Sequence, residues 1–288
     1  MECEPKYGGK FMDDERMINI SNIIYAYLEN FNTDNLDVFI KNMVNNIVQK
    51  LSLQDYIGHV HILEVYDKEP ATKGMLDNEG NICVFREGIE KKLSAVLEEL
   101  PGLSEYEINL CRCLLYVKTI IHELEHVNQK KLLTEDSENS TLETLIIRLC
   151  DAERSKDGFF YYCLYASYPT ERLAELKAFR IITKVIESLE AKFDIEMLSF
   201  YMKKQAILEE FHNYWEYGLT GPTEHYFSVW NNEGFSVLQA TKANKELRLE
   251  DRVLLGLEIS RPEYEGMVLQ CMSLDKSLKS LLEKRKNK

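Results

Sequence analysis

Two histidines four residues apart, with a glutamate beside the first, form the pattern in this sequence that most clearly predicts chemistry. The stretch reads His122-Glu123-Leu124-Glu125-His126 and has the form H-E-x-x-H. On a helix, residues four apart lie on one face, so both imidazoles can aim at the same point. Such a helix supplies two zinc ligands, and its glutamate can act as a general base in hydrolysis. The alternative interpretation is a solvated helix face.

A catalytic zinc ion also needs a third protein ligand, and the strongest candidates lie downstream. Glu171 and Glu175 are four residues apart in a predicted amphipathic helix over residues 170–192, so their carboxylates share a face. If Glu171 binds the ion, Glu175 could accept the outer N–H of a ligand histidine. The reverse assignment stays open, as does a pair of solvated carboxylates. The small side chains of Ala174 and Ala178 would let this helix approach the motif helix closely.

The elements that position these residues are predicted from hydrophobic periodicity. Apolar residues at steps of three to five place the motif on a helix, which begins at a capping box formed by Ser104 and Glu107. Upstream we predict helices over 13–31 and 34–51, strands over 56–66 and 81–86 with a turn at 77–80 between them, and a helix over 88–100. Downstream we predict helices over 141–154, 170–192 and 194–217, and short helices that end in a charged one near residue 288.

Composition limits the class of protein. The net charge of −13 disfavours nonspecific nucleic-acid binding, which needs Lys and Arg to neutralise phosphates. The basic stretch Lys284–Lys288 is expected to be a solvated helix end. The seven cysteines include no C-x-x-C pair and are expected to be buried reduced thiols of a cytoplasmic protein. We expect no signal peptide, and no apolar run approaches the length of a membrane span.

On these residues the sequence resembles the gluzincin zinc peptidases, and most nearly their small ImmA/IrrE-like forms, the minigluzincins. The likeness covers about residues 56–190 at the superfamily level. It implies that Glu171 is the third ligand and that Glu175 replaces the usual aspartate of the second helix. It also implies that strand 81–86 could pair with an extended substrate. One departure is Glu125, because zinc peptidases usually carry an uncharged residue there; a solvent-facing position would accommodate it.

These patterns together predict an α+β, mostly helical fold. A small N-terminal antiparallel sheet would pack on a two-helix zincin-like core with extra flanking helices. The expected domains are an N-terminal helical pair (1–55), a zincin-like metallopeptidase core (56–192) and a helical C-terminal extension (193–288), with a single domain as the alternative.

The predicted function is zinc-dependent hydrolysis of a peptide or protein substrate. His122, His126 and Glu171 would hold one Zn²⁺ per chain, and Glu123 would act as general base on the zinc-bound water. Candidate oxyanion stabilisers are His225 and Tyr226, followed by His212 and Tyr168. The alternative function is a noncatalytic zinc-binding or regulatory helical module that keeps the fold.

Overall fold

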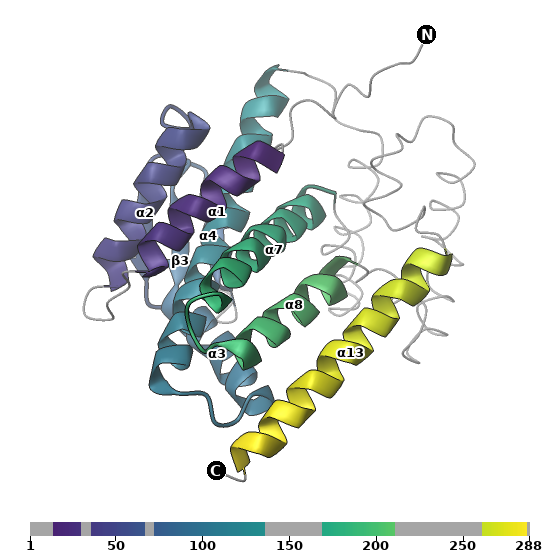
Figure 1. The fold of residues 1–288 in the computed structure, drawn as a ribbon. Helices are drawn as coiled ribbons and strands as arrows, with labels where there is room; N and C mark the ends of the chain where they lie inside the picture. The colour runs from purple at the N-terminus through teal and green to yellow at the C-terminus, as the bar shows by residue number, and fades with distance from the viewer. Residues whose placement is uncertain (1–13, 30–35, 67–71, 136–168, 211–260, 287–288) are drawn as a thin grey trace, which may run out of the picture. The chain divides into compact units, whose positions relative to one another are not determined.

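The computed structural model describes residues 14–29, 36–66, 72–135, 169–210 and 261–286. Within these ranges the fold is α+β and mostly helical, as the sequence predicts. The helices are α1 (Asp14–Glu29), α2 (Leu36–Leu51), α3 (Arg86–Glu99), α4 (Glu105–Glu135), α7 (Pro169–Glu190), α8 (Glu196–Glu210) and α13 (Arg261–Lys286), and the strands are β1 (Val60–Leu63), β2 (Gly74–Leu76) and β3 (Ile82–Phe85) (Figure 1). The predicted helix over 141–154 lies outside the described residues.

The sheet is mixed, so the prediction of an antiparallel sheet is wrong for one of its two strand pairs. Its strand order is β1-β3-β2, with β1 parallel to β3 and β2 antiparallel to β3. The predicted turn exists: Asp77 Oδ1 accepts the backbone N–H groups of Glu79 and Asn81, and Gly80 adopts a φ of +82°. However, this turn joins β3 to β2, a strand that the sequence patterns did not predict, and not to β1.

Strand β3 lies in the centre of the sheet. Ile82–Phe85 pairs with β1 along one edge and with β2 along the other, and all four residues are buried. Its backbone groups are therefore committed on both sides, and the expectation that this strand could pair with an extended substrate is wrong. Within the described ranges, β1 and β2 are the edge strands.

Helix α4 is the element on which the sheet and the helices α2 and α3 pack. Its predicted capping box is confirmed, because Ser104 Oγ accepts the N–H of Glu107 while Glu107 Oε2 accepts the N–H of Ser104 at 2.8 Å. From this cap α4 contacts α2, α3, β2 and β3. Its buried apolar residues form the middle of the core: Leu110, Leu114, Val117, Ile120, Ile121, Leu124 and Val127.

The C-terminal helix α13 is anchored at the start of α4. Arg285 donates to both carboxylate oxygens of Glu107, at 2.9 and 3.0 Å, and to the carbonyl oxygen of Gly102. Burial would raise the pKa of Glu107, but the hydrogen bonds from Arg285 and Ser104 outweigh it and hold that pKa below its usual range. The prediction that the basic tail is a solvated helix end is therefore wrong for Arg285.

Chain contacts divide the protein into two compact units. The first comprises residues 1–135, 177–205 and 274–288, and the second comprises residues 136–176 and 206–273. The first unit contains the sheet, α1 to α4 and most of α7 and α8. Helix α7 spans residue 176, where the division between the two units falls.

Two further properties bear on the class of protein. No helix in the described part of the chain is long and apolar enough to cross a membrane. The cysteines in that part, Cys83, Cys111, Cys113 and Cys271, are buried free thiols, as the scattered spacing predicts.

Candidate metal centre

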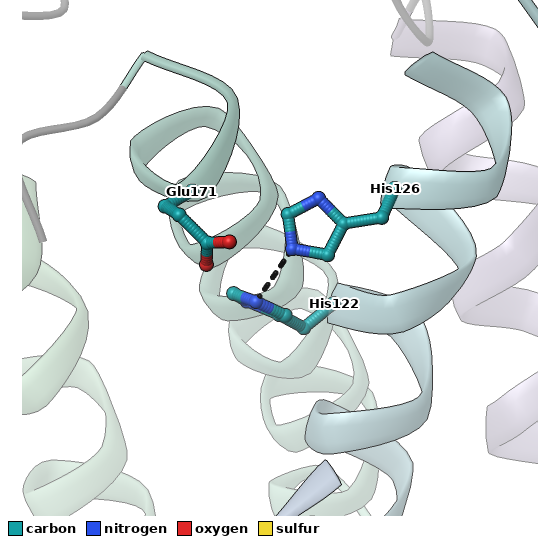
Figure 2. Close-up of side chains that lie close together, drawn as sticks. All are labelled: His122, His126 and Glu171. Atoms are coloured by element: carbon teal, nitrogen blue, oxygen red, sulfur yellow. Dashed lines mark hydrogen bonds between the residues drawn. The ribbon is translucent and has the colours of Figure 1, made fainter. Parts of the chain in front are cut away.

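Helix α4 brings the two motif histidines together. The Nε2 atoms of His122 and His126 lie 3.0 Å apart, and the two rings meet at an interplanar angle of 84° (Figure 2). Both side chains are partly buried. The four-residue spacing produces this convergence, because it stacks the two side chains on one helix face.

Helix α7 supplies the third member of the group. One ligand atom from each of His122, His126 and Glu171 lies within 4.8 Å of the others, and this is the sole such group of His, Cys, Asp or Glu among the described residues. Glu171 stands in the first turn of α7 and points its carboxylate toward the imidazoles (Figure 2). Glu175 is half-buried one turn further on and is not part of the group.

The hydrogen-bond pattern of the histidines suits a metal ion. Gln129 Oε1 lies 3.0 Å from His126 Nδ1 and can only accept, so Nδ1 carries the proton and Nε2 presents a bare lone pair. Two imidazole nitrogens 3.0 Å apart need a proton or a cation between them. Ligand nitrogens on a tetrahedral zinc ion are about 3.3 Å apart, from Zn–N distances of about 2.0–2.1 Å. The histidine pair therefore fits zinc with a displacement of a few tenths of an ångström.

Glu123 is buried beside this group, against the edge strand β2. Its side chain is buried, and a Cβ placed on Gly74 of β2 would lie 3.0 Å from Glu123 Oε1 and 2.5 Å from Thr119 Cγ2. Only a glycine lets the strand backbone come this close to the helix. The sequence patterns missed both Gly74 and its strand. The signal that could have found them is a lone glycine shortly before a turn.

Cys83 also lies near the carboxylate of Glu123 but is no ligand candidate. Burial raises the pKa of the Cys83 thiol, and the charges of Asp77 and Glu123 raise it further. Cys83 is not part of the group that His122, His126 and Glu171 form.

Glu125 does not face solvent; its side chain is fully buried. Its Oε1 accepts a hydrogen bond from Lys177 Nζ on α7 at 2.7 Å, and the Lys177 side chain is buried as well. The expectation that Glu125 faces solvent is therefore wrong. Its charge can be buried because Lys177, on another helix, neutralises it. Ala174 and Ala178 of α7 are fully buried; their role in bringing α7 close to the motif helix stays a prediction.

The candidate oxyanion stabilisers His225, Tyr226, His212 and Tyr168 all lie outside the described residues. Their assignment stays a prediction. The described part of the site thus comprises His122 and His126 with Glu123 on α4, and Glu171 on α7.

Comparisons of the chain with protein-family models, with curated proteins and with solved structures return no match. The resemblance to the zinc peptidases therefore rests on the residues of this chain and on the geometry described above.

Proposed function

We propose that this protein is a zinc-dependent metallopeptidase. The observation that carries the proposal is the convergence of His122, His126 and Glu171 within 4.8 Å. Glu123, the residue after His122 on the same helix, is buried. Two imidazole nitrogens and one carboxylate are a ligand set of catalytic zinc sites, which leave a further position open. Calcium and magnesium prefer sites made of oxygen ligands, so the two histidines favour zinc.

The residues of the chain would divide the work between binding and proton transfer. When bound, zinc supplies Lewis acidity, which lowers the pKa of water toward neutrality and polarises a carbonyl group. Glu123 would accept the proton of the attacking water and deliver it to the leaving amine. Gln129 would hold His126 in the tautomer that presents Nε2. Glu175 would accept a hydrogen bond from a ligand histidine.

The position of β2 supports a peptide as the substrate. This strand passes next to Glu123 at Gly74 and, among the described residues, pairs only with β3. An extended peptide that adds to its other edge would run past the carboxylate of the general base. Backbone hydrogen bonds would then hold the substrate without depending on its side chains.

We also propose that the enzyme acts in the cytoplasm. The support is that none of the four described cysteines forms a disulfide bond. Free thiols are typical of reducing compartments.

The experiment that tests the proposal measures zinc and activity in matched variants. We expect about one zinc per purified chain, measured by elemental analysis, as in other catalytic zinc sites. His122→Ala and Glu171→Gln should lose the metal, whereas Glu123→Gln should keep it and lose cleavage of a peptide library followed by mass spectrometry. Glu187→Gln is the matched control for Glu171→Gln, because it removes the same charge from an exposed position of the same helix. Glu175→Gln tests whether the two carboxylates exchange roles.

Each outcome has a distinct meaning. Absence of zinc from the wild type, with no uptake on addition, would refute the site. Loss of zinc in Glu175→Gln and retention in Glu171→Gln would exchange the roles of the two carboxylates. Zinc binding without cleavage of any peptide would favour the noncatalytic binding module.

A further inference from the structure

A buried ion pair joins the two helices that carry the site. Glu125 Oε1 on α4 and Lys177 Nζ on α7 lie 2.7 Å apart, with side-chain exposures of 0 % and 5 %. Glu125 immediately precedes the ligand His126 in the sequence, and Lys177 follows Glu171 by six residues on the same uninterrupted helix. At about 1.5 Å per residue, Lys177 therefore stands about 9 Å along α7 from Glu171.

This pair is a poor means of gaining stability. Removing two charges from water costs about as much as their attraction returns, and apolar side chains of similar volume often stabilise such a position as well or better. The pair is also incompletely satisfied, because Glu125 Oε2 has no hydrogen-bond partner among the residues that the structure describes. A buried polar group left in this state is costly. An explanation other than stability is therefore needed.

A buried charge pair does fix position. An apolar contact between helices tolerates more than one register, whereas a buried lysine must keep a carboxylate within hydrogen-bond distance. On the same helix as Lys177, Ala174 and Ala178 offer only small side chains, and both are fully buried. The ion pair is thus a contact between α4 and α7 that depends on their register.

We propose that the ion pair of Glu125 and Lys177 is a positioning device that sets the register of α7 on α4, so that the Glu171 carboxylate meets the Nε2 atoms of His122 and His126. This inference rests on the proposed zinc site. It assigns no contact with substrate or metal to Glu125 or Lys177. It also explains why a charged residue, Glu125, occupies the second x of the H-E-x-x-H motif.

The test separates metal affinity from fold stability. In the double variant Glu125→Leu/Lys177→Met, the metal-free protein should melt at the same or a higher temperature than the wild type. Its zinc affinity, measured by competition with a chromophoric chelator, should fall tenfold or more, as expected when a group that orients ligands is lost. Visible absorption of the Co²⁺-substituted protein should change as well, because the ligand geometry has loosened.

The control uses a second lysine–glutamate pair, which joins α7 to a different helix. Glu190 of α7 and Lys203 of α8 also meet at 2.7 Å, at the end of α7 far from Glu171. The double variant Glu190→Leu/Lys203→Met should bind zinc as tightly as the wild type. If leucine at position 125 prevents folding, Glu125→Met/Lys177→Met makes the same comparison, because unbranched methionine adapts to irregular space.

The outcomes distinguish this inference from the proposed function. Equal zinc affinity and equal Co²⁺ spectra in the wild type and the apolar double variant would overturn the positioning role and leave the metal site intact. An equal loss of affinity in the control pair would also overturn it, since the effect would then be a general one. A wild type that binds no zinc would overturn the proposed function itself, and the inference with it.

Discussion

Replacing Gly74 with alanine should displace the proposed general base without touching a ligand. The new methyl group would lie 2.5 Å from Thr119 Cγ2 and 3.0 Å from Glu123 Oε1. Ordinary carbon contacts begin at 3.4 Å, so β2 and α4 must separate by about 0.9 Å at this point. Neither side can yield cheaply, because β2 is hydrogen-bonded to β3 and Thr119 lies on the buried face of α4.

The expected size of the effect follows from this displacement. Overpacking of this kind costs about 1–3 kcal/mol of unfolding free energy, which for a chain of this size lowers the melting temperature by about 2–12 °C. A shift of about 1 Å in a catalytic group can lower the rate about 100-fold. Zinc content should stay at the wild-type level, because the three atoms nearest the methyl group belong to Thr119, Glu123 and Cys83 and to none of the proposed ligands.

The assay compares three variants for melting temperature, zinc content and peptide cleavage. Gly266→Ala is the matched control: it lies in α13 with no atom within 4 Å of the added Cβ, and helix propensity predicts a gain of about 0.5–1 kcal/mol. Gly74→Ala/Thr119→Ser removes the closest contact and should recover most of the lost stability. The serine can keep the hydrogen bond that Thr119 Oγ1 donates to the carbonyl of Leu115. Unchanged melting temperature and cleavage in Gly74→Ala would refute the reasoning.

Three other predictions use different parts of the fold. Arg285→Met should cost about 2 kcal/mol at pH 7. The pKa of Glu107 is lower in the folded protein than in the unfolded chain, where it is about 4.3. The stabilisation from the charged carboxylate is therefore present above about pH 4.3 and is lost as pH falls through the folded pKa. The variant lacks the Arg285 contact, so it should lose less stability than the wild type between about pH 5 and 3; parallel plots of melting temperature against pH would contradict this. Burial raises the pKa of Cys111 to about 12 and raises that of Cys113 as well, so iodoacetamide at pH 8 should label neither in the native protein, and peptide mapping that finds rapid labelling would contradict their burial. Gln129→Leu should weaken zinc binding about 10–100-fold in chelator competition, and unchanged affinity would show that it does not orient His126.

Local signals explain what could be predicted from the sequence. The cap at Ser104 and the placement of His122 and His126 depend on residues three or four apart, and a helix fixes such neighbours by its own geometry. The turn before β3 is local for the same reason, since Asp77 reaches the backbone of Asn81. These features were therefore accessible before any tertiary contact was known.

Strand β2 was not accessible in this way. Three residues, Gly74–Leu76, are too few to display an alternating pattern, and their glycine lowers strand propensity. What makes them a strand is the pairing with β3 and the close passage over α4 at Thr119, both of which are tertiary. The error in the sheet followed from this omission, because the turn was assigned to β1 and β3 and so made those two strands antiparallel.

The expectation that Glu125 faces solvent failed for a different reason, and that reason gives a rule about which helices are neighbours. A charged side chain is almost never fully buried without a partner, so a sequence pattern assigns it to solvent by default. Here the partner is Lys177, 52 residues away along the chain. Each of the two residues breaks the apolar pattern of its own helix, and the ion pair between them accounts for both breaks. Two opposite charges on the predicted inner faces of two helices therefore predict that those helices are neighbours. In this chain the pair of Glu125 and Lys177 obeys that rule, because it joins α4 to α7, the helix that carries Glu171.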